Sequence, residues 1–200
     1  MLPLTKDEQR RLLELARQAI AAAQSGTPLD LDAVAARLPS EQLRQPGAAF
    51  VTLHHQRRLR GCIGNVRAGK PLYQTIAECA RAAAFHDPRF EPVTAEEVPE
   101  LEIEISLLSP FFPIQPHEVK PGEHGLMVTQ GLQRGLLLPQ VAPEHHWNRE
   151  QFLEEACAKA GLERDAWKKG AELEAFTAFV FSEGSSLAGP SVVNPSGRRS

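Results

Sequence analysis

The segment from Leu101 to Leu107 alternates strictly between apolar and polar side chains, and this alternation constrains the fold more than any other feature. Because successive side chains of a strand point to opposite faces of a sheet, Leu101, Ile103, Ile105 and Leu107 share one face. A strand with one buried and one polar face is typical of an antiparallel sheet whose other face is not covered. The segment therefore predicts a sheet of this kind.

Other stretches predict the elements around this strand. Helical spacing of apolar residues, with capping residues such as Thr5, Asp30 and Asn148, predicts helices over 6–23, 31–38, 71–85 and 149–160. Hairpins are expected at 50–64, around a polar tip at 55–58, and at 126–138, around Gly131. Ala175 to Phe181 is apolar on both faces, which is typical of a covered central strand. The predicted fold class is α+β, with antiparallel sheets and flanking helices.

Length and composition limit the organisation of the chain. Two hundred residues, 42% of them hydrophobic, fit one domain with its own core, expected over residues 1–183, and a flexible Ser/Gly/Pro-rich tail over 184–200. A net charge of −3 argues against general nucleic-acid binding. Three widely spaced cysteines favour a reducing compartment, and no stretch resembles a signal peptide or a membrane helix. We expect a cytoplasmic protein.

Cys62 is the candidate for chemistry. It lies in Leu59-Arg-Gly-Cys-Ile-Gly, beside Arg60 and between Gly61 and Gly64, and no acidic residue occurs from His55 to Thr75. A positive field favours the nucleophilic thiolate, and glycines let backbone N–H groups approach a substrate. The alternative is a packed core thiol, with glycines that only let a helix pack closely on the strand.

Phe85-His-Asp-Pro-Arg-Phe is a second candidate segment. His86 beside Asp87 fits a base oriented by a carboxylate, or simply a histidine at a helix C-terminus. Arg89 fits a ligand carboxylate or phosphate, or a loop-holding pair with Asp87. The histidine and cysteine spacings indicate no metal site. Gly64 to Lys70 matches the start of a phosphate-binding loop, but Pro71 stands where a hydroxyl is required.

Several ordered segments resemble the AMME-syndrome candidate gene family, which is also called AmmeMemoRadiSam system protein A. They are Leu59–Gly64, Ala84–Phe90, Glu102–Pro110, Gly135–Val141 and Phe152–Leu162. The resemblance implies a larger lobe that holds both termini, a smaller inserted lobe and a cleft near Cys62. It implies no settled activity. It also implies Memo-like and radical S-adenosylmethionine proteins as partners, which would carry the redox cofactors, so we expect no cofactor in this chain.

The enzyme hypothesis gives each candidate residue a role. Cys62 attacks an electrophilic carbon, Arg60 and the N–H groups at Gly61 and Gly64 stabilise negative charge on oxygen, and His86 moves protons. Asp87 and Arg89 complete a site for a small anionic or carbonyl-bearing ligand. The alternative hypothesis is a non-catalytic adaptor or regulatory binding module in which Cys62 is a core residue.

Overall fold

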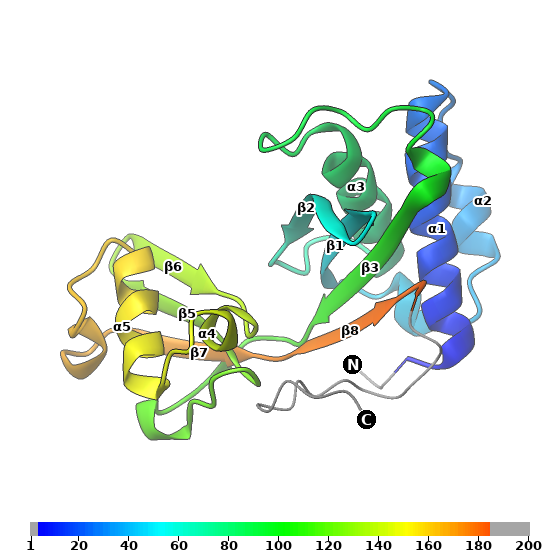
Figure 1. Ribbon diagram of the computed structural model, residues 1–200. Helices are drawn as coiled ribbons and strands as arrows, with labels where there is room; N and C mark the ends of the chain where they lie inside the picture. Colours follow the sequence, from blue (N-terminus) through cyan, green and yellow to red (C-terminus); the bar gives the residue numbers. More distant parts are fainter. Residues whose placement is uncertain (1–3, 185–200) are drawn as a thin grey trace, which may run out of the picture. The chain divides into compact units, whose positions relative to one another are not determined.

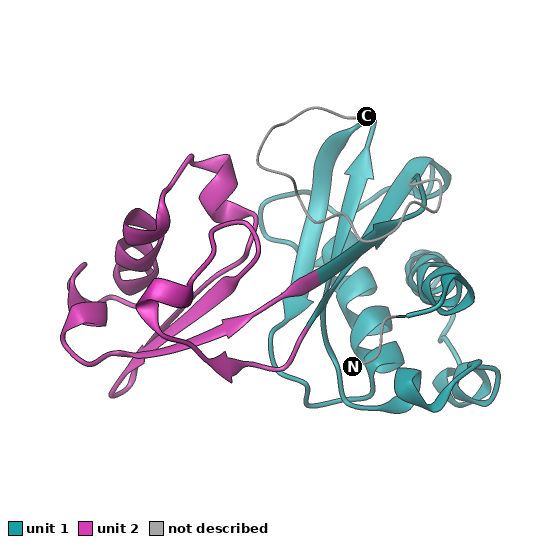
Figure 2. Cartoon of the chain, turned by 90° about the horizontal axis from the view of Figure 1, so that it is seen from below, with its two compact units in different colours: residues 1–108, 179–190 teal, residues 109–178, 191–200 magenta. Residues whose placement is uncertain are grey.

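The computed structural model describes residues 4–184 (Figure 1). These residues form two compact units, one made of 4–108 with 179–184 and the other of 109–178 (Figure 2). Each unit has one four-stranded sheet and one hydrophobic core. Helices and antiparallel sheets occur together in both, which confirms the predicted α+β class.

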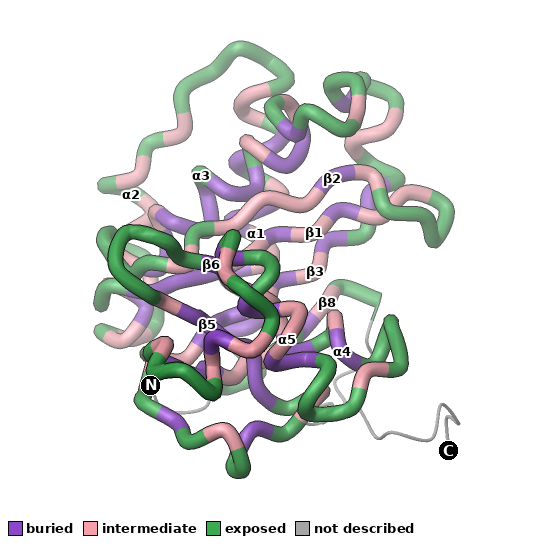
Figure 3. The backbone as a smooth tube through the Cα atoms, turned by 90° about the vertical axis from the view of Figure 1, so that its left-hand side faces the viewer, coloured by how far each residue is buried: buried purple, intermediate pink, exposed green. Residues whose placement is uncertain are grey.

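The sheet of unit 1 has the strand order β2-β1-β3-β8. Its strands are β1 (Ala48–His55), β2 (Arg58–Asn65), β3 (Leu101–Leu108) and β8 (Ala178–Ser182). The predicted alternation is confirmed, because Leu101, Ile103, Ile105 and Leu107 are all buried in the core. In β1, Val51 and Leu53 are also fully buried, whereas Thr52 between them is half-buried. Figure 3 colours the described chain by burial. The sheet therefore has an inner face toward the core and an outer face.

Helices α1 (Lys6–Gln24) and α3 (Leu72–Phe85) pack on the inner face of this sheet and on each other. The predicted capping box of α1 is present, since the Thr5 hydroxyl accepts the Glu8 N–H and the Glu8 carboxylate accepts the Thr5 N–H. Asp30 caps the short α2 (Leu31–Ala36) as expected. Pro71 is the N-cap of α3 and not its first helical residue.

The hairpin between β1 and β2 turns at Gln56 and Arg57, which have φ of 51° and 65°. Two consecutive residues with positive φ make the turn type whose twist matches that of a hairpin, although asparagine and glycine usually supply it. The register places Cys62 opposite Thr52 and shifts once, between Leu53 and His54. The β1–β3 pairing places Glu104 opposite Thr52 on its other side.

The sheet of unit 2 has the order β4-β7-β5-β6. Its strands are β4 (Phe112–Pro113), β5 (Gly125–Gln130), β6 (Gln133–Leu137) and β7 (Glu172–Phe176). Helix α5 (Arg149–Lys159) packs against β5 and β6, and Asn148 caps it as predicted; α4 (Val141–Glu144) is a single turn. Phe152 and Leu126 are fully buried in this core.

The prediction of one central strand over Ala175–Phe181 is wrong. The run is divided at Thr177 into β7, which lies inside the sheet of unit 2, and β8, which is an edge strand of unit 1. Ala175 packs in one core and Phe181 in the other, so the residues are apolar because they serve two cores. The Thr177 N–H donates to the Ser109 hydroxyl, and its carbonyl accepts the Ser109 N–H, both at 2.9 Å.

The predicted tail at 184–200 lies, apart from Gly184, outside the described residues. Within residues 4–184, no helix combines the length and apolar character that a bilayer crossing requires.

Candidate functional site

Cys62 lies in the middle of β2, and its side chain points to the outer face of the sheet. The register sets this direction, because Cys62 pairs with Thr52, whose neighbours Val51 and Leu53 face the core. The Thr52 hydroxyl donates a hydrogen bond to Cys62 Sγ at 3.2 Å. The residue as a whole is half-buried, unlike the other two cysteines, which are buried.

The backbone of Cys62 is held at the free edge of β2 by two side chains from the segment after α3. The Cys62 N–H donates to Asp87 Oδ2 at 2.8 Å, and the Cys62 carbonyl accepts from Arg89 Nη2 at 3.3 Å. In a paired strand, a residue makes the same two contacts with the neighbouring strand, one through its N–H and one through its carbonyl. Asp87 and Arg89 therefore occupy the hydrogen-bonding groups that an edge strand otherwise leaves free.

Asp87 and Arg89 also bind each other, as one of the two sequence interpretations proposed. Arg89 Nε donates to Asp87 Oδ1 at 2.9 Å and Nη2 donates to Oδ2 at 2.7 Å. Asp87 is buried, and its pKa lies well below the usual value because the Arg89 guanidinium and then the Cys62 N–H stabilise the charged form against the cost of burial. The pair is therefore ionised at neutral pH.

Arg60 is held in a second cluster and is not directed at Cys62. Its Nε and Nη2 donate to the two carboxylate oxygens of Glu97 at 2.7 and 3.0 Å. Nη1 and Nη2 also donate to the carbonyls of Glu91 and Pro92. The Arg60 guanidinium lowers the pKa of Glu97 to about 2. With its donors committed in this way, Arg60 fixes the start of β2 to residues 91–97.

The glycines of this segment have packing roles. A Cβ at Gly61 would overlap the carbonyl oxygen of Ala83 in α3, so a glycine is needed for the close contact of β2 with that helix. A Cβ at Gly64 would overlap the Phe50 ring on the outer face. These contacts match the alternative in which the glycines flanking Cys62 permit close packing.

The outer face carries one more titratable group in register with Cys62. Cys62, Thr52 and Glu104 occupy adjacent positions on β2, β1 and β3. Partial burial raises the pKa of Glu104, and the neighbouring His54 opposes this only in part. The sequence predicted a solvated polar face for β3, which holds for the exposed Glu102 but not for the half-buried Glu104.

His86 is placed elsewhere. It is the C-cap residue of α3, and its exposed side chain lines a groove formed with α1 and the α1–α2 connection. Among residues 4–184, no hydrogen bond connects its ring with Cys62 or Asp87. The same residues contain no cluster of His, Cys, Asp and Glu side chains that could hold a metal ion.

Cys62 differs from the other two cysteines. Cys79 is 5% exposed in the core of unit 1, and burial raises the pKa of its thiol to about 11. Cys157 is fully buried in unit 2, and burial raises its pKa as well. Both stand among apolar residues of a predicted helix, which favours core positions, and the structure confirms them there. Cys62 is therefore the one cysteine of the described residues that is not buried.

Three contributors were absent from the predicted site. The alternation of apolar and polar residues from Phe50 to Leu53 places Thr52 on the outer face. It does not show which strands lie beside Thr52. Thr94 and Glu97 have the spacing of a capped turn, and Glu97 does accept the Thr94 N–H at 2.8 Å, but its main partner, Arg60, is 37 residues away. Glu104 is recognised only once the strand register is known.

Replacing Gly61 with alanine tests the packing role. We expect Gly61→Ala to lower the free energy of unfolding by roughly 1–3 kcal/mol, because α3 has to move away from β2. Gly69→Ala is the matched control, since nothing lies within 4 Å of its Cβ position, and it should change stability by less than about 0.5 kcal/mol. Urea unfolding measures both, and equal effects would contradict the assignment.

The Arg60–Glu97 pair predicts a pH dependence of stability. The pKa of Glu97 is depressed to about 2 in the folded chain, against an ordinary value of 4.5. Its contribution is therefore complete above pH 4.5 and is lost as the pH falls toward 2. Glu97→Gln should lower the free energy of unfolding by about 2 kcal/mol at neutral pH. It should also reduce the further loss of stability as the pH falls, and urea unfolding from pH 2 to 7 measures both effects.

The exposed Glu14, which contacts Arg11 at 3.2 Å on α1, provides the control for this pair. Glu14→Gln should lower the free energy of unfolding by less than about 0.5 kcal/mol. It should leave the loss of stability at acid pH as in the wild type. A Glu97→Gln variant that loses stability at acid pH as steeply as the wild type would show that the Arg60–Glu97 pair does not cause this pH dependence.

Comparisons with known proteins identify related chains. The AMMECR1 family matches residues 13–181. The chain is 41% identical over 175 residues to a protein of Methanothermobacter thermautotrophicus, covering 82% of this chain and 88% of that one. It is 40% identical over 193 residues to protein LS215_2104 of Saccharolobus islandicus, covering 90% and 83%.

A solved structure shows the same fold. The crystal structure of the uncharacterized protein PH0010 from Pyrococcus horikoshii is similar with a TM-score of 0.75 and 35% identity, covering 90% of this chain and 94% of that one. The segments from Leu59 to Leu162 that carry the predicted resemblance all lie within the matched residues. The chain therefore belongs to the AMMECR1 family.

Proposed function

We propose that this protein is an enzyme in which Cys62 forms a covalent bond with the carbonyl carbon of a substrate. The observation that carries the proposal is the placement of its thiol. Cys62 is a half-buried residue at an outer-face position of the sheet, its Sγ accepts a hydrogen bond from Thr52, and its backbone is fixed by Asp87 and Arg89. Preorganisation of this kind is typical of catalytic nucleophiles.

The proposed step is an addition to a carbonyl group. The sulfur forms a bond to the carbonyl carbon, and the C=O π electrons move to the oxygen. The thiol proton passes through water to the Glu104 carboxylate on the same face of the sheet, while the Thr52 hydroxyl donates to Sγ and stabilises the thiolate. Glu104 then protonates the new oxygen, which gives a neutral hemithioacetal. The raised pKa of Glu104 suits a group that both accepts and returns a proton.

This assignment changes the roles expected from the sequence. Arg60 is a positioning residue, because its guanidinium is committed to Glu97 and the 91–92 carbonyls. Asp87 and Arg89 are positioning residues for the Cys62 backbone. His86 has no part in the step, since it lines a groove with α1. Glu104 takes its place in proton transfer, and the Thr52 hydroxyl stabilises the thiolate.

The pathway remains part of the proposal. The resemblance supports Memo-like and radical S-adenosylmethionine proteins as partners, which would carry out the redox chemistry on a shared substrate. In that arrangement, this chain would supply the thiol addition and the partners would supply the cofactors.

Thiol labelling of the full chain tests the nucleophile. Iodoacetamide at neutral pH, followed by peptide mass mapping, should modify Cys62 at least about tenfold faster than Cys79 and Cys157, which burial protects. Cys62→Ser should lose the fast phase and keep the thermal midpoint of the wild type. Labelling of Cys62 no faster than Cys79, with destabilisation of the Cys62→Ser variant, would contradict the enzyme proposal and favour the adaptor hypothesis.

The pH profile of the same reaction tests Glu104. Glu104→Gln should slow Cys62 alkylation at neutral pH about tenfold or more and remove the wild-type rise in rate that accompanies ionisation of Glu104. Glu102→Gln is the matched control on the same strand and face, with an exposed side chain, and should stay within about twofold of the wild type. Equal effects of the two substitutions would exclude Glu104 as the proton acceptor.

A further inference from the structure

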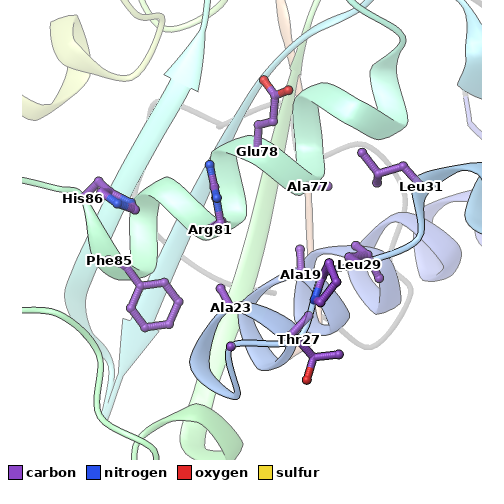
Figure 4. Close-up of a pocket in the computed structure, with 13 residues that line it drawn as sticks. Ala19, Ala23, Thr27, Leu29, Leu31, Ala77, Glu78, Arg81, Phe85 and His86 are labelled. Carbon is purple, nitrogen blue, oxygen red and sulfur yellow. The ribbon is translucent and has the colours of Figure 1, made fainter.

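We propose that unit 1 carries a second binding site, a groove that takes a small molecule with an apolar body and one carboxylate. The groove lies between the C-terminal half of α1, the α1–α2 connection and α3, and its volume is about 670 Å³ (Figure 4). Known small-molecule sites span about 300–1,000 Å³. It shares no residue with the Cys62, Thr52 and Glu104 row, so it is independent of the proposed chemistry.

The wall of the groove is largely apolar. Small side chains on α1 and α3 leave the space between the two helices, and larger apolar groups close it at both ends (Figure 4). Several of these groups are half-buried, so their apolar surface is open to a ligand. The residues that form this lining are Ala19, Ala22, Ala23, Leu29, Leu31 and Phe85.

Arg81 and His86 form the polar part of the groove, and both belong to the α3 side. Ala77, Arg81 and Phe85 are four residues apart and lie on one face of the helix. Across the described chain, no hydrogen bond or ion pair engages the side chain of Arg81 or His86. Glu78, also in the lining, accepts from Lys70 Nζ at 2.7 and 2.8 Å, so its charge is compensated.

The charges around the groove favour an anionic ligand. Arg60 and Arg89 each have a carboxylate partner inside the protein, whereas the Arg81 guanidinium has none among the described residues. Its planar fork of donors matches the two oxygens of a carboxylate. The C-terminal end of α3 opposes an anion weakly, but Arg81 lies a turn earlier, and the Ala84 carbonyl is already bound by the Val93 N–H.

Octanoate is the probe, because it combines one carboxylate with an apolar chain. Isothermal titration calorimetry on the full chain should show saturable 1:1 binding of octanoate. Octanol has the same chain without the charge, and acetate has the charge without the chain, so each should bind at least about tenfold more weakly. Absence of saturable octanoate binding, or equal binding of octanol, would overturn the proposal.

Two substitutions, each with a matched control, locate the site. Arg81→Gln should weaken octanoate binding about tenfold or more, while Arg67→Gln, another exposed arginine without an ion pair in the described chain, should leave it within about twofold. Ala23→Leu should fill the groove and abolish binding. Ala21→Leu places the same side chain on an exposed position of α1 outside the groove and should not.

Circular dichroism melting of each variant checks that it is folded. Wild-type affinity in a folded Arg81→Gln or Ala23→Leu variant would show that octanoate binds elsewhere and would refute the site. None of these substitutions touches Cys62, so the labelling experiment tests the proposed enzyme separately.

Discussion

The geometry of the candidate site depends on how the free edge of β2 is held. An edge strand exposes unpaired backbone groups, and this one is paired by side chains instead of by another strand. Asp87 accepts the Cys62 N–H, and Arg89 donates to the Cys62 carbonyl. Two residues before Cys62, at the bulged start of the strand, Glu97 holds Arg60. Both carboxylates come from the segment after α3, so the end of that helix fixes the position of the thiol.

Close packing on the other face of β2 supports the same arrangement. Gly61 lies against the Ala83 carbonyl, so the strand and α3 approach more closely than any side chain would permit. Since Asp87 follows α3 by two residues, this contact brings its carboxylate within reach of the Cys62 N–H. Alternation along the strand then separates the roles, because Gly61 faces the helix while Cys62 faces Thr52. A short motif thus combines packing on one side with a reactive group on the other.

Local signals predicted the elements well. The capping box at Thr5 and Glu8, the Asn148 cap and the alternation of β3 each depend on neighbouring residues, and each is present as expected. The run from Ala175 to Phe181 was misjudged, because apolar residues look alike in sequence whether they enter one core or two. The contacts of the candidate site were likewise predictable only where the two residues are close in sequence. Asp87 pairing with Arg89 was within reach of sequence reasoning, since the two residues are neighbours, whereas Arg60 pairing with Glu97 was not.

The sequence by itself determined the fold class, the positions of most helices and strands, the core location of Cys79 and Cys157, and the prominence of Cys62. These depend on periodicity, capping and burial, which act over a few residues. Tertiary structure alone decided that Arg60 serves Glu97, that Thr52 and Glu104 lie in a row with the thiol, and that His86 belongs to a groove beside α1. Such contacts join residues far apart in the chain, and only the strand register and helix packing bring them together.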